Sequence, residues 1–278
     1  MPRVTADSAR SRLSALVAVG ALAACGASTP AAGASPSTEV RHTPLIHVPR
    51  GEAQITFNEP GASLTVTISL TGLAPDSLHP AHIHQGSCAQ QGRILYPLSP
   101  VSANPTGMAA DRTSTVAHVG EGGIPASGWY LNVHNGPEMT RAPQSQPIVC
   151  GDVANPARAK AVTVPLISGP PETLDQAASG MADLSIQNGR LHVTLEAQGL
   201  EPGSSHSAGL HRGSCESQSR SLAPLGTMTA DAHGAARRSV DVTELGSMPG
   251  PSYVIVHRGQ TVDTQAEADP ILCGNIGA

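Results

Sequence analysis

The sequence predicts an all-β chain that contains two tandem copies of one β-barrel or β-sandwich domain. Three observations lead to this fold class. Apolar and polar residues alternate with a period of two in several short runs, 29 glycines and 24 prolines among 278 residues supply frequent turns, and one series of motifs occurs twice. After the N-terminal leader, no segment shows a convincing helical period.

The alternation is clearest in two runs at matching places in the two copies. In 64–70, Leu, Val and Ile alternate with Thr and Ser, and in 191–197, Leu, Val and Ala alternate with His, Thr and Glu. This pattern is typical of antiparallel strands with one buried face. Further strands are expected at 53–58, 114–119, 129–134, 161–167, 181–186 and 253–257.

The repeat is defined by two groups of matching residues. At a shift of 127 positions, Gly72-Leu73 meets Gly199-Leu200, and the further matches are His79 with His206, His84 with His211, and Cys88 with Cys215. At a shift of 123, the matches are Val133-His134 with Val256-His257 and Cys150-Gly151 with Cys273-Gly274. We therefore expect a first domain at 49–156 and a second domain at 157–278.

The N-terminus predicts export and a membrane anchor. Arginines precede a short apolar run at 13–24, which suits the core of a signal peptide at 1–24. The run ends in Ala24-Cys25-Gly26, which resembles a bacterial lipobox, in which Cys25 would carry the lipid. Residues 25–48 would then be the lipidated cysteine and a flexible tether, holding the exported body at the outward or periplasmic face of a membrane. An ordinary cleaved signal with a chance cysteine is the alternative.

Composition excludes one class of partner. Aromatic residues make up 2% of the chain and the formal net charge is -5. A chain with so few stacking side chains and this charge is not expected to bind nucleic acid.

The cysteines predict two disulfides. Without Cys25, four cysteines remain, and an even set is normally paired in an oxidising compartment. Three pairings are open to four cysteines. Because each copy holds two, the simplest is Cys88 with Cys150 and Cys215 with Cys273.

Histidines carry the candidate chemistry. His82 and His84 are two residues apart, so in an extended strand they share one face, and a neighbouring strand could bring in His134. Three neutral imidazoles suit copper or zinc, and copper binds more tightly. The alternative is that the histidine pair only caps polar groups at a sheet edge.

These motifs resemble the copper-zinc superoxide dismutases, particularly the bacterial lipoprotein members. The resemblance rests on the segment from His79 to Gln85, the cysteine four residues after His84, the later Val-His pair, and the closing Cys-Gly pairs. The CHRD domain is similar over the same stretch. The resemblance implies a Greek-key β-barrel in each copy, copper ligands at His82, His84 and His134, and a structural role for His79, which would orient the ligand strand by bonding to backbone.

The departures from that family limit the expected chemistry. Where the family carries its bridging histidine and zinc ligands, residues 90–111 contain no histidine and only Asp111. The guiding arginine expected before the last cysteine is missing as well. We therefore expect copper without zinc, no assigned catalytic residue, and at most weak superoxide dismutation.

The second copy departs further. Gly209 stands where His82 stands in the first copy, which leaves His211 and His257 as a weak second metal site, with His206 in the structural position of His79. We expect the second copy to be mainly a structural domain. The remaining histidines, His47 among them, are expected to be solvated.

Three functions are compatible with the sequence. The first is a membrane-anchored lipoprotein that binds or handles copper, the second a non-enzymatic CHRD-like structural or interaction module, and the third a weak copper-only superoxide dismutase. The short linker after Cys150 also suits an intramolecular pseudo-dimer of the two domains. The sequence identifies no protein partner.

Overall fold

A computed structural model describes residues 40–120, 122–140, 142–167 and 174–277. The expected signal peptide at 1–24, the lipidation site Cys25 and the tether up to residue 39 lie outside the described residues. The predicted all-β class is confirmed, because nearly every described element is a strand. The exceptions are two 3-10 turns, η1 (Glu59–Gly61) and η2 (Leu174–Ala177), and one short helix, α1 (Gln265–Ala268).

One sheet contains eight antiparallel strands, and its two edge strands contact each other, so that it has a barrel-like form. In sheet order the strands are β15 (Gln218–Thr229), β14 (Ser205–Gly213), β17 (Ser252–His257), β18 (Pro270–Ile276), β1 (Val40–His47), β12 (Ser179–Gln187), β13 (Arg190–Gln198) and β16 (Ala236–Val242). Apart from β1, all of these strands come from the C-terminal half of the chain.

The N-terminal half, which corresponds to the first expected domain at 49–156, forms two four-stranded sheets and a two-stranded ladder, and one strand, β11 (Ala161–Leu166), joins it from beyond residue 157. The first sheet has the order β10 (Pro147–Asp152), β9 (Trp129–His134), β5 (Ala81–Ser87) and β6 (Gln90–Pro97). The second has the order β11, β2 (Arg50–Asn58), β3 (Ser63–Thr71) and β8 (Ala109–Val116), and the ladder pairs β4 (Leu78–His79) with β7 (Val101–Ser102). An isolated bridge between Cys150 and Ile167 links the two sheets beside β10 and β11.

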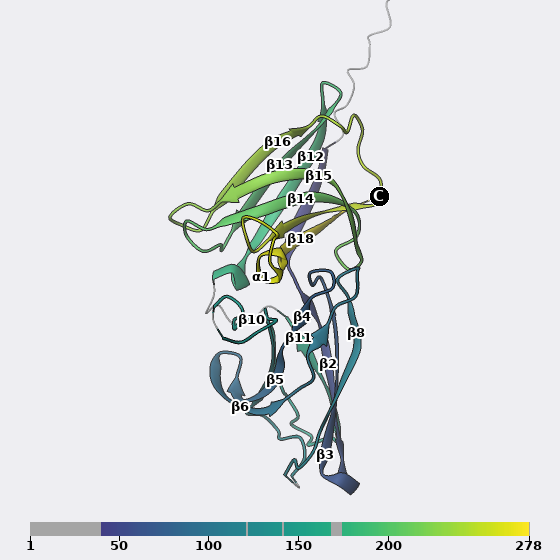
Figure 1. The fold of residues 1–278 in the computed structure, drawn as a ribbon, viewed down its shortest axis with the longest axis vertical. Coiled ribbons are helices and arrows are strands. Elements are labelled where there is room, and N and C mark those ends of the chain that lie inside the picture. The colour runs from purple at the N-terminus through teal and green to yellow at the C-terminus, as the bar shows by residue number, and fades with distance from the viewer. Residues whose placement is uncertain (1–39, 121, 141, 168–173, 278) are drawn as a thin grey trace, which may run out of the picture. The chain divides into compact units, whose positions relative to one another are not determined.

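Two strands cross between the halves. β1 lies at the start of the described chain, yet it pairs with β12 and β18 of the C-terminal half, where its purple ribbon runs among green and yellow strands (Figure 1). β11 follows the expected domain boundary at residue 157, yet it pairs with β2 of the N-terminal half. Each half therefore completes its sheet with a strand from the other side of the chain.

The buried side chains form two large hydrophobic clusters, one in each half. The cluster of the N-terminal half includes Leu166 of β11, and that of the C-terminal half includes Leu45 of β1. Both clusters consist mainly of Val, Leu, Ile and Ala at alternate strand positions, which explains how a chain with so few aromatics can bury a core. The crossing strands thus contribute to packing as well as to backbone pairing.

Both predicted disulfides are present. Cys88 is bonded to Cys150 and Cys215 to Cys273, with Cα atoms 6.0 and 5.9 Å apart. Each bond ties the segment after an inner strand to the last strand of the same half, β10 or β18. A cross-link that closes a loop of this length contributes about 3 to 4 kcal/mol to stability.

Within the described part of the chain, no helix is both long enough and apolar enough to cross a lipid bilayer.

The crossing of β1 predicts a difference between two adjacent residues. Leu45 is 1% exposed inside the C-terminal core, whereas Ile46 is 40% exposed. Leu45→Ala should therefore lower the free energy of unfolding by about 3 kcal/mol, and Ile46→Ala by less than about 1 kcal/mol. Urea unfolding of the disulfide-bonded protein, followed by circular dichroism, measures both values.

The same comparison can be made at the end of β11, where Leu166 is fully buried and the next residue, Ile167, is 61% exposed. Equal and small effects at Leu45 and Ile46 would contradict the placement of β1 in the C-terminal sheet.

Candidate metal centre

The pairing of β5 with β9 brings the three predicted histidines together. His84 lies opposite Tyr130, and His82 lies opposite Asn132, two residues before His134. Because side chains directly opposite one another in an antiparallel pair share a face, His82, His84 and His134 all lie on the same side of this sheet. Ile83, between the two β5 histidines, points into the core.

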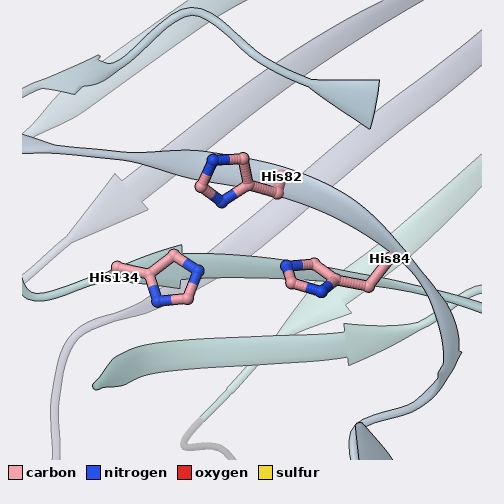
Figure 2. Close-up of side chains that lie close together, drawn as sticks. All are labelled: His82, His84 and His134. Atoms are coloured by element: carbon pink, nitrogen blue, oxygen red, sulfur yellow. The ribbon is translucent and has the colours of Figure 1, made fainter. Parts of the chain in front are cut away.

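The three rings converge on one point (Figure 2). Ring centroids are 5.6 Å apart for His82 and His84, 5.2 Å for His82 and His134, and 6.1 Å for His84 and His134. One nitrogen from each ring lies within 4.8 Å of the other two. Imidazole nitrogens on one zinc ion, each about 2.0 Å from it, would be roughly 3.3 to 4 Å apart, so small side-chain rotations would allow all three to bind one ion.

Backbone carbonyls fix the tautomers of two of the rings. His84 donates its Nδ1 hydrogen to the carbonyl oxygen of Gly92 at 3.0 Å, and His134 donates its Nδ1 hydrogen to that of Ser145 at 2.9 Å. In a neutral imidazole the other nitrogen, Nε2, then carries a lone pair. Both Nε2 atoms are therefore prepared to bind a metal.

Burial favours the neutral form of two of the three rings, His82 and His134. His84 and His134 are buried and His82 is half-buried. Desolvation lowers the pKa of His134 to about 4, against the bond to Ser145, and the neighbouring histidines lower it further. Desolvation, together with the charge of His84, also lowers the pKa of His82. Neutral imidazole is the form that binds metals.

The free nitrogen atoms match the needs of a metal ion. Nδ1 of His82, Nε2 of His84 and Nε2 of His134 are buried, and none has a hydrogen-bond partner among the described residues. An unsatisfied buried polar group costs about 1 to 3 kcal/mol. Three such atoms that face one another form a donor set of nitrogens only, which suits copper or zinc and does not suit magnesium or calcium.

His79, just before β5, bonds to the backbone of His134 at the end of β9. Its Nδ1 donates to the carbonyl oxygen of His134 at 3.0 Å, and its Nε2 lies 2.7 Å from the hydroxyl of Ser77. His206 makes the matching contacts in the C-terminal half, with the carbonyl of His257 at 3.1 Å and Ser204 at 2.6 Å. Both rings therefore bond to backbone, which is the kind of contact expected for a structural histidine.

The C-terminal half also contacts the backbone that holds the site. The side-chain amide of Gln265, in α1, donates to the carbonyl oxygens of Leu78 and Asn135 and accepts from the amide of Leu78. Asp269 is buried, and its Oδ1 lies 3.9 Å from Nε2 of His79. Burial raises the pKa of the Asp269 carboxyl group. α1 and the residue after it thus pack against both segments that position the histidines.

The second pair of histidines has a different surrounding. His211 donates its Nδ1 hydrogen to Ser219 and His257 donates to Ala268, so their Nε2 atoms carry lone pairs as in the first half. Burial lowers the pKa of both rings, as at His134. The third ligand is missing, because Gly209 stands where His82 stands in the first half and has no side chain. Among the described residues, only His82, His84 and His134 form a group of three metal-binding side chains.

Two neighbours of the site were not predicted. The ring of Tyr130 stacks on His84, with centroids 4.9 Å apart, and its hydroxyl accepts a hydrogen bond from the amide of Gly92. Asn132 is fully buried, and neither atom of its amide group has a partner among the described residues. Strand alternation from His134 places both on the ligand face, and this signal was available in the sequence.

The comparisons with known proteins give a partial match. The model of the CHRD domain matches residues 31–138, a stretch that contains all three histidines of the site. The chain is thus similar to CHRD domains over this part of its length. No curated protein matches the chain.

The expectation that His47 is solvated was wrong. His47 ends β1, and neither of its ring nitrogens has a partner among the described residues. Burial lowers its pKa to about 4, and the positive charges of Arg258 and Arg50 act in the same direction. The crossing of β1 into the other half explains the error, because a tether residue would have been exposed.

These shifts predict that the metal-free protein loses stability in acid. For His47 and His134 the folded pKa, about 4, lies below the ordinary value of 6.5. Between these values the unfolded chain binds protons that the folded chain excludes. The free energy of unfolding therefore has its full value above pH 6.5 and falls as the pH is lowered towards 4. Each group accounts for about 3 kcal/mol of this loss. Urea unfolding of the metal-free protein between pH 7 and pH 4 measures it.

One variant identifies the source of the loss. His47→Leu should reduce the pH dependence by about one proton. Equal stability of the unsubstituted protein at both ends of this pH range would contradict the assignment.

Proposed function

We propose that this chain is a copper-binding protein whose ion is held by His82, His84 and His134. The observation that carries the proposal is the presence of three buried nitrogen atoms without partners within 4.8 Å of one another. Hydrogen bonds from Nδ1 to backbone carbonyls already fix two of the rings in the metal-binding tautomer. Such bonds are typical of histidines that bind metals.

Copper is favoured over other ions by the ligand chemistry. Imidazole binds copper and zinc well, and copper binds more tightly to a given set of nitrogen ligands. No carboxylate takes part in this group of side chains. Bound copper would supply one-electron redox chemistry, while the protein orients the imidazoles and limits access of water to two of the three rings. Because His82 is the most exposed ligand, small molecules would enter from its side.

We further propose that the two halves are copies of one superoxide dismutase-like Greek-key domain that form an intramolecular pseudo-dimer. The repeat shifts of 127 and 123 positions carry β3 onto β13, β8 onto β16, β9 onto β17 and both cysteines of the first half onto those of the second. Read through the bridge at Ile167, the order β6-β5-β9-β10-β11-β2-β3-β8 matches the order of the eight-stranded sheet. The second copy would support the first and bind copper weakly, if at all, through His211 and His257.

The proposed setting is an exported body attached to a membrane by a lipid on Cys25. The two disulfides support an oxidising compartment, because such bonds are rare where thiols are kept reduced. A metal site on a tethered domain would meet copper outside the cytoplasm, as expected for copper binding or handling at the cell envelope.

Copper titration tests the proposed site. The protein should bind one equivalent of Cu(II) tightly, and His82→Ala, His84→Ala and His134→Ala should each weaken binding by about 100-fold or more, because two imidazoles remain. Trp129 is the one tryptophan of the chain, and its neighbour Tyr130 stacks on His84, so quenching of its fluorescence reports binding. Equilibrium dialysis gives the stoichiometry.

The matched control is His192→Ala, a histidine on β13 that pairs with Asp241 on the protein surface. This variant should bind copper as the unsubstituted protein does. If His82→Ala and His84→Ala retained full affinity, the proposed site would be wrong.

A second candidate is a non-enzymatic structural or interaction module, which the CHRD match at residues 31–138 favours. In that case the histidines would only hold the sheet edge, and copper at micromolar concentration would leave the melting temperature unchanged. Copper binding to the folded protein should instead raise it, because a ligand that binds only the native state stabilises that state.

A third candidate, weak superoxide dismutation, is tested by the rate of the copper-loaded protein. Three protein ligands can leave a coordination position for a small molecule. No histidine or arginine stands in the positions where the family has its bridging and guiding residues, so the rate should be far below the diffusion limit. A rate no higher than that of the same concentration of free copper would exclude this activity.

A further inference from the structure

The amide of Asn132 is the unexplained polar group of the ligand face. We propose, on the basis of the copper site above, that Asn132 binds a water molecule or small anion that accompanies the metal. No role follows for this residue from the three-histidine set itself. The argument rests on its position, its burial, its missing partners and its replacement in the other half of the chain.

Asn132 lies at the centre of the ligand face. It pairs with His82 on β5 and with Cys150 on β10, and it stands two residues before His134 on β9. Two residues in the other direction is Tyr130, whose ring stacks on His84. Alternation along β9 puts the side chains of Tyr130, Asn132 and His134 on one face. Asn132 is therefore on the same face as the three histidines, between Tyr130 and His134 along β9.

Both functions of this amide group are unused. The side chain is 0% exposed, and neither Oδ1 nor Nδ2 has a hydrogen-bond partner among the described residues. Asparagine can donate two hydrogen bonds and accept two. In a protein interior such groups are nearly always satisfied by protein or by an ordered small molecule. A packing role alone would be served better by an apolar residue of similar size.

The C-terminal half provides an internal comparison. The residue that matches Asn132 is Ile255, and the residue that matches His82 is Gly209. These two also face each other across the sheet, as His82 and Asn132 do. The polar pair of the first half is thus replaced as a pair by glycine and isoleucine. This joint replacement links the asparagine to the metal site rather than to the fold, which the second half retains without it.

The chemistry of the amide indicates what it binds. A neutral amide oxygen is a weaker ligand for copper than imidazole, and three imidazoles are already present. The group can, however, donate to an anion or water through Nδ2 and accept from water through Oδ1. Both properties suit a water molecule or a small anion on the ligand face. Asn132 is therefore assigned as a positioning residue for that molecule.

Azide is the probe for this assignment. The copper-loaded protein is titrated with azide, and the charge-transfer absorption of the azide–Cu(II) pair gives the dissociation constant. Asn132→Val should retain one equivalent of copper with an affinity within about threefold of the unsubstituted protein. Its azide affinity should fall by about tenfold, the size of effect expected for one lost hydrogen bond to a charged ligand.

A readout without metal accompanies this titration. Because Asn132→Val removes an unsatisfied buried amide, the metal-free variant should melt at a higher temperature, by about 3 °C. Asn132→Leu serves as the second variant if Asn132→Val does not fold, and circular dichroism establishes that either variant has the strand content of the parent.

The C-terminal half offers a gain-of-function control. Gly209→His should add a second copper equivalent, because the new imidazole would join His211 and His257. The atom closest to the new Cβ is Nε2 of His211 at 2.7 Å, the end of a side chain, so a small shift of that ring relieves the contact. Adding Ile255→Asn to this variant should tighten azide binding at the new site by about tenfold, the reverse of the effect in the first half.

The outcomes separate the two proposals. If Asn132→Val retains copper and binds azide as tightly as the parent, the role of Asn132 is overturned while the copper site stands. If copper affinity itself falls tenfold and azide affinity does not, Asn132 is a metal ligand and the assignment is also overturned. If the unsubstituted protein binds no copper, the copper site is wrong, and the assignment of Asn132 fails with it.

Discussion

The site depends on the antiparallel register between β5 and β9. This register sets His84 against Tyr130 and His82 against Asn132, and it leaves His134 beside them on the same face. A slip of one residue in β9 would turn His134 into the core and bring Val133 to the ligand face. Several contacts hold the register, including the bond from His79 to the carbonyl of His134 and the pairing of β9 with β10.

The two halves stabilise each other through exchanged strands. β1 completes the C-terminal sheet and β11 pairs in the N-terminal half, so the core of each half includes side chains from a segment beyond the expected domain boundary. α1 adds hydrogen bonds to Leu78 and Asn135, directly beside His79 and His134. These contacts give the C-terminal half a physical role even where its own histidines lack a third ligand.

Local patterns predicted what depends on local chemistry. The strand class follows from period-two alternation, the disulfides from two cysteines in each half, and the meeting of His82 with His84 from their spacing. The crossing of β1 was not predictable in this way, because alternation shows which face of a strand is buried but not which sheet receives it. The error at His47 has this cause. Asn132 was not predicted as part of the site because a neutral amide is neither titratable nor a preferred ligand for copper.

A comparison of the halves separates the residues that the fold requires from those that belong to the three-histidine site. Both halves have a tyrosine ring against the matching histidine, stacked on His84 in the first half and tilted against His211 in the second. Both also have the histidine that bonds to backbone and the Nδ1 bonds that fix two rings. Only the N-terminal half retains His82 and Asn132, whose buried atoms lack partners and therefore reduce the stability of the metal-free protein. In the C-terminal half, Gly209 and Ile255 stand in these positions, and neither has a polar side-chain atom to leave without a partner. Groups that destabilise a fold when empty are expected where a ligand binds, and His82 and Asn132 face each other across β5 and β9, beside the two other histidines of the site.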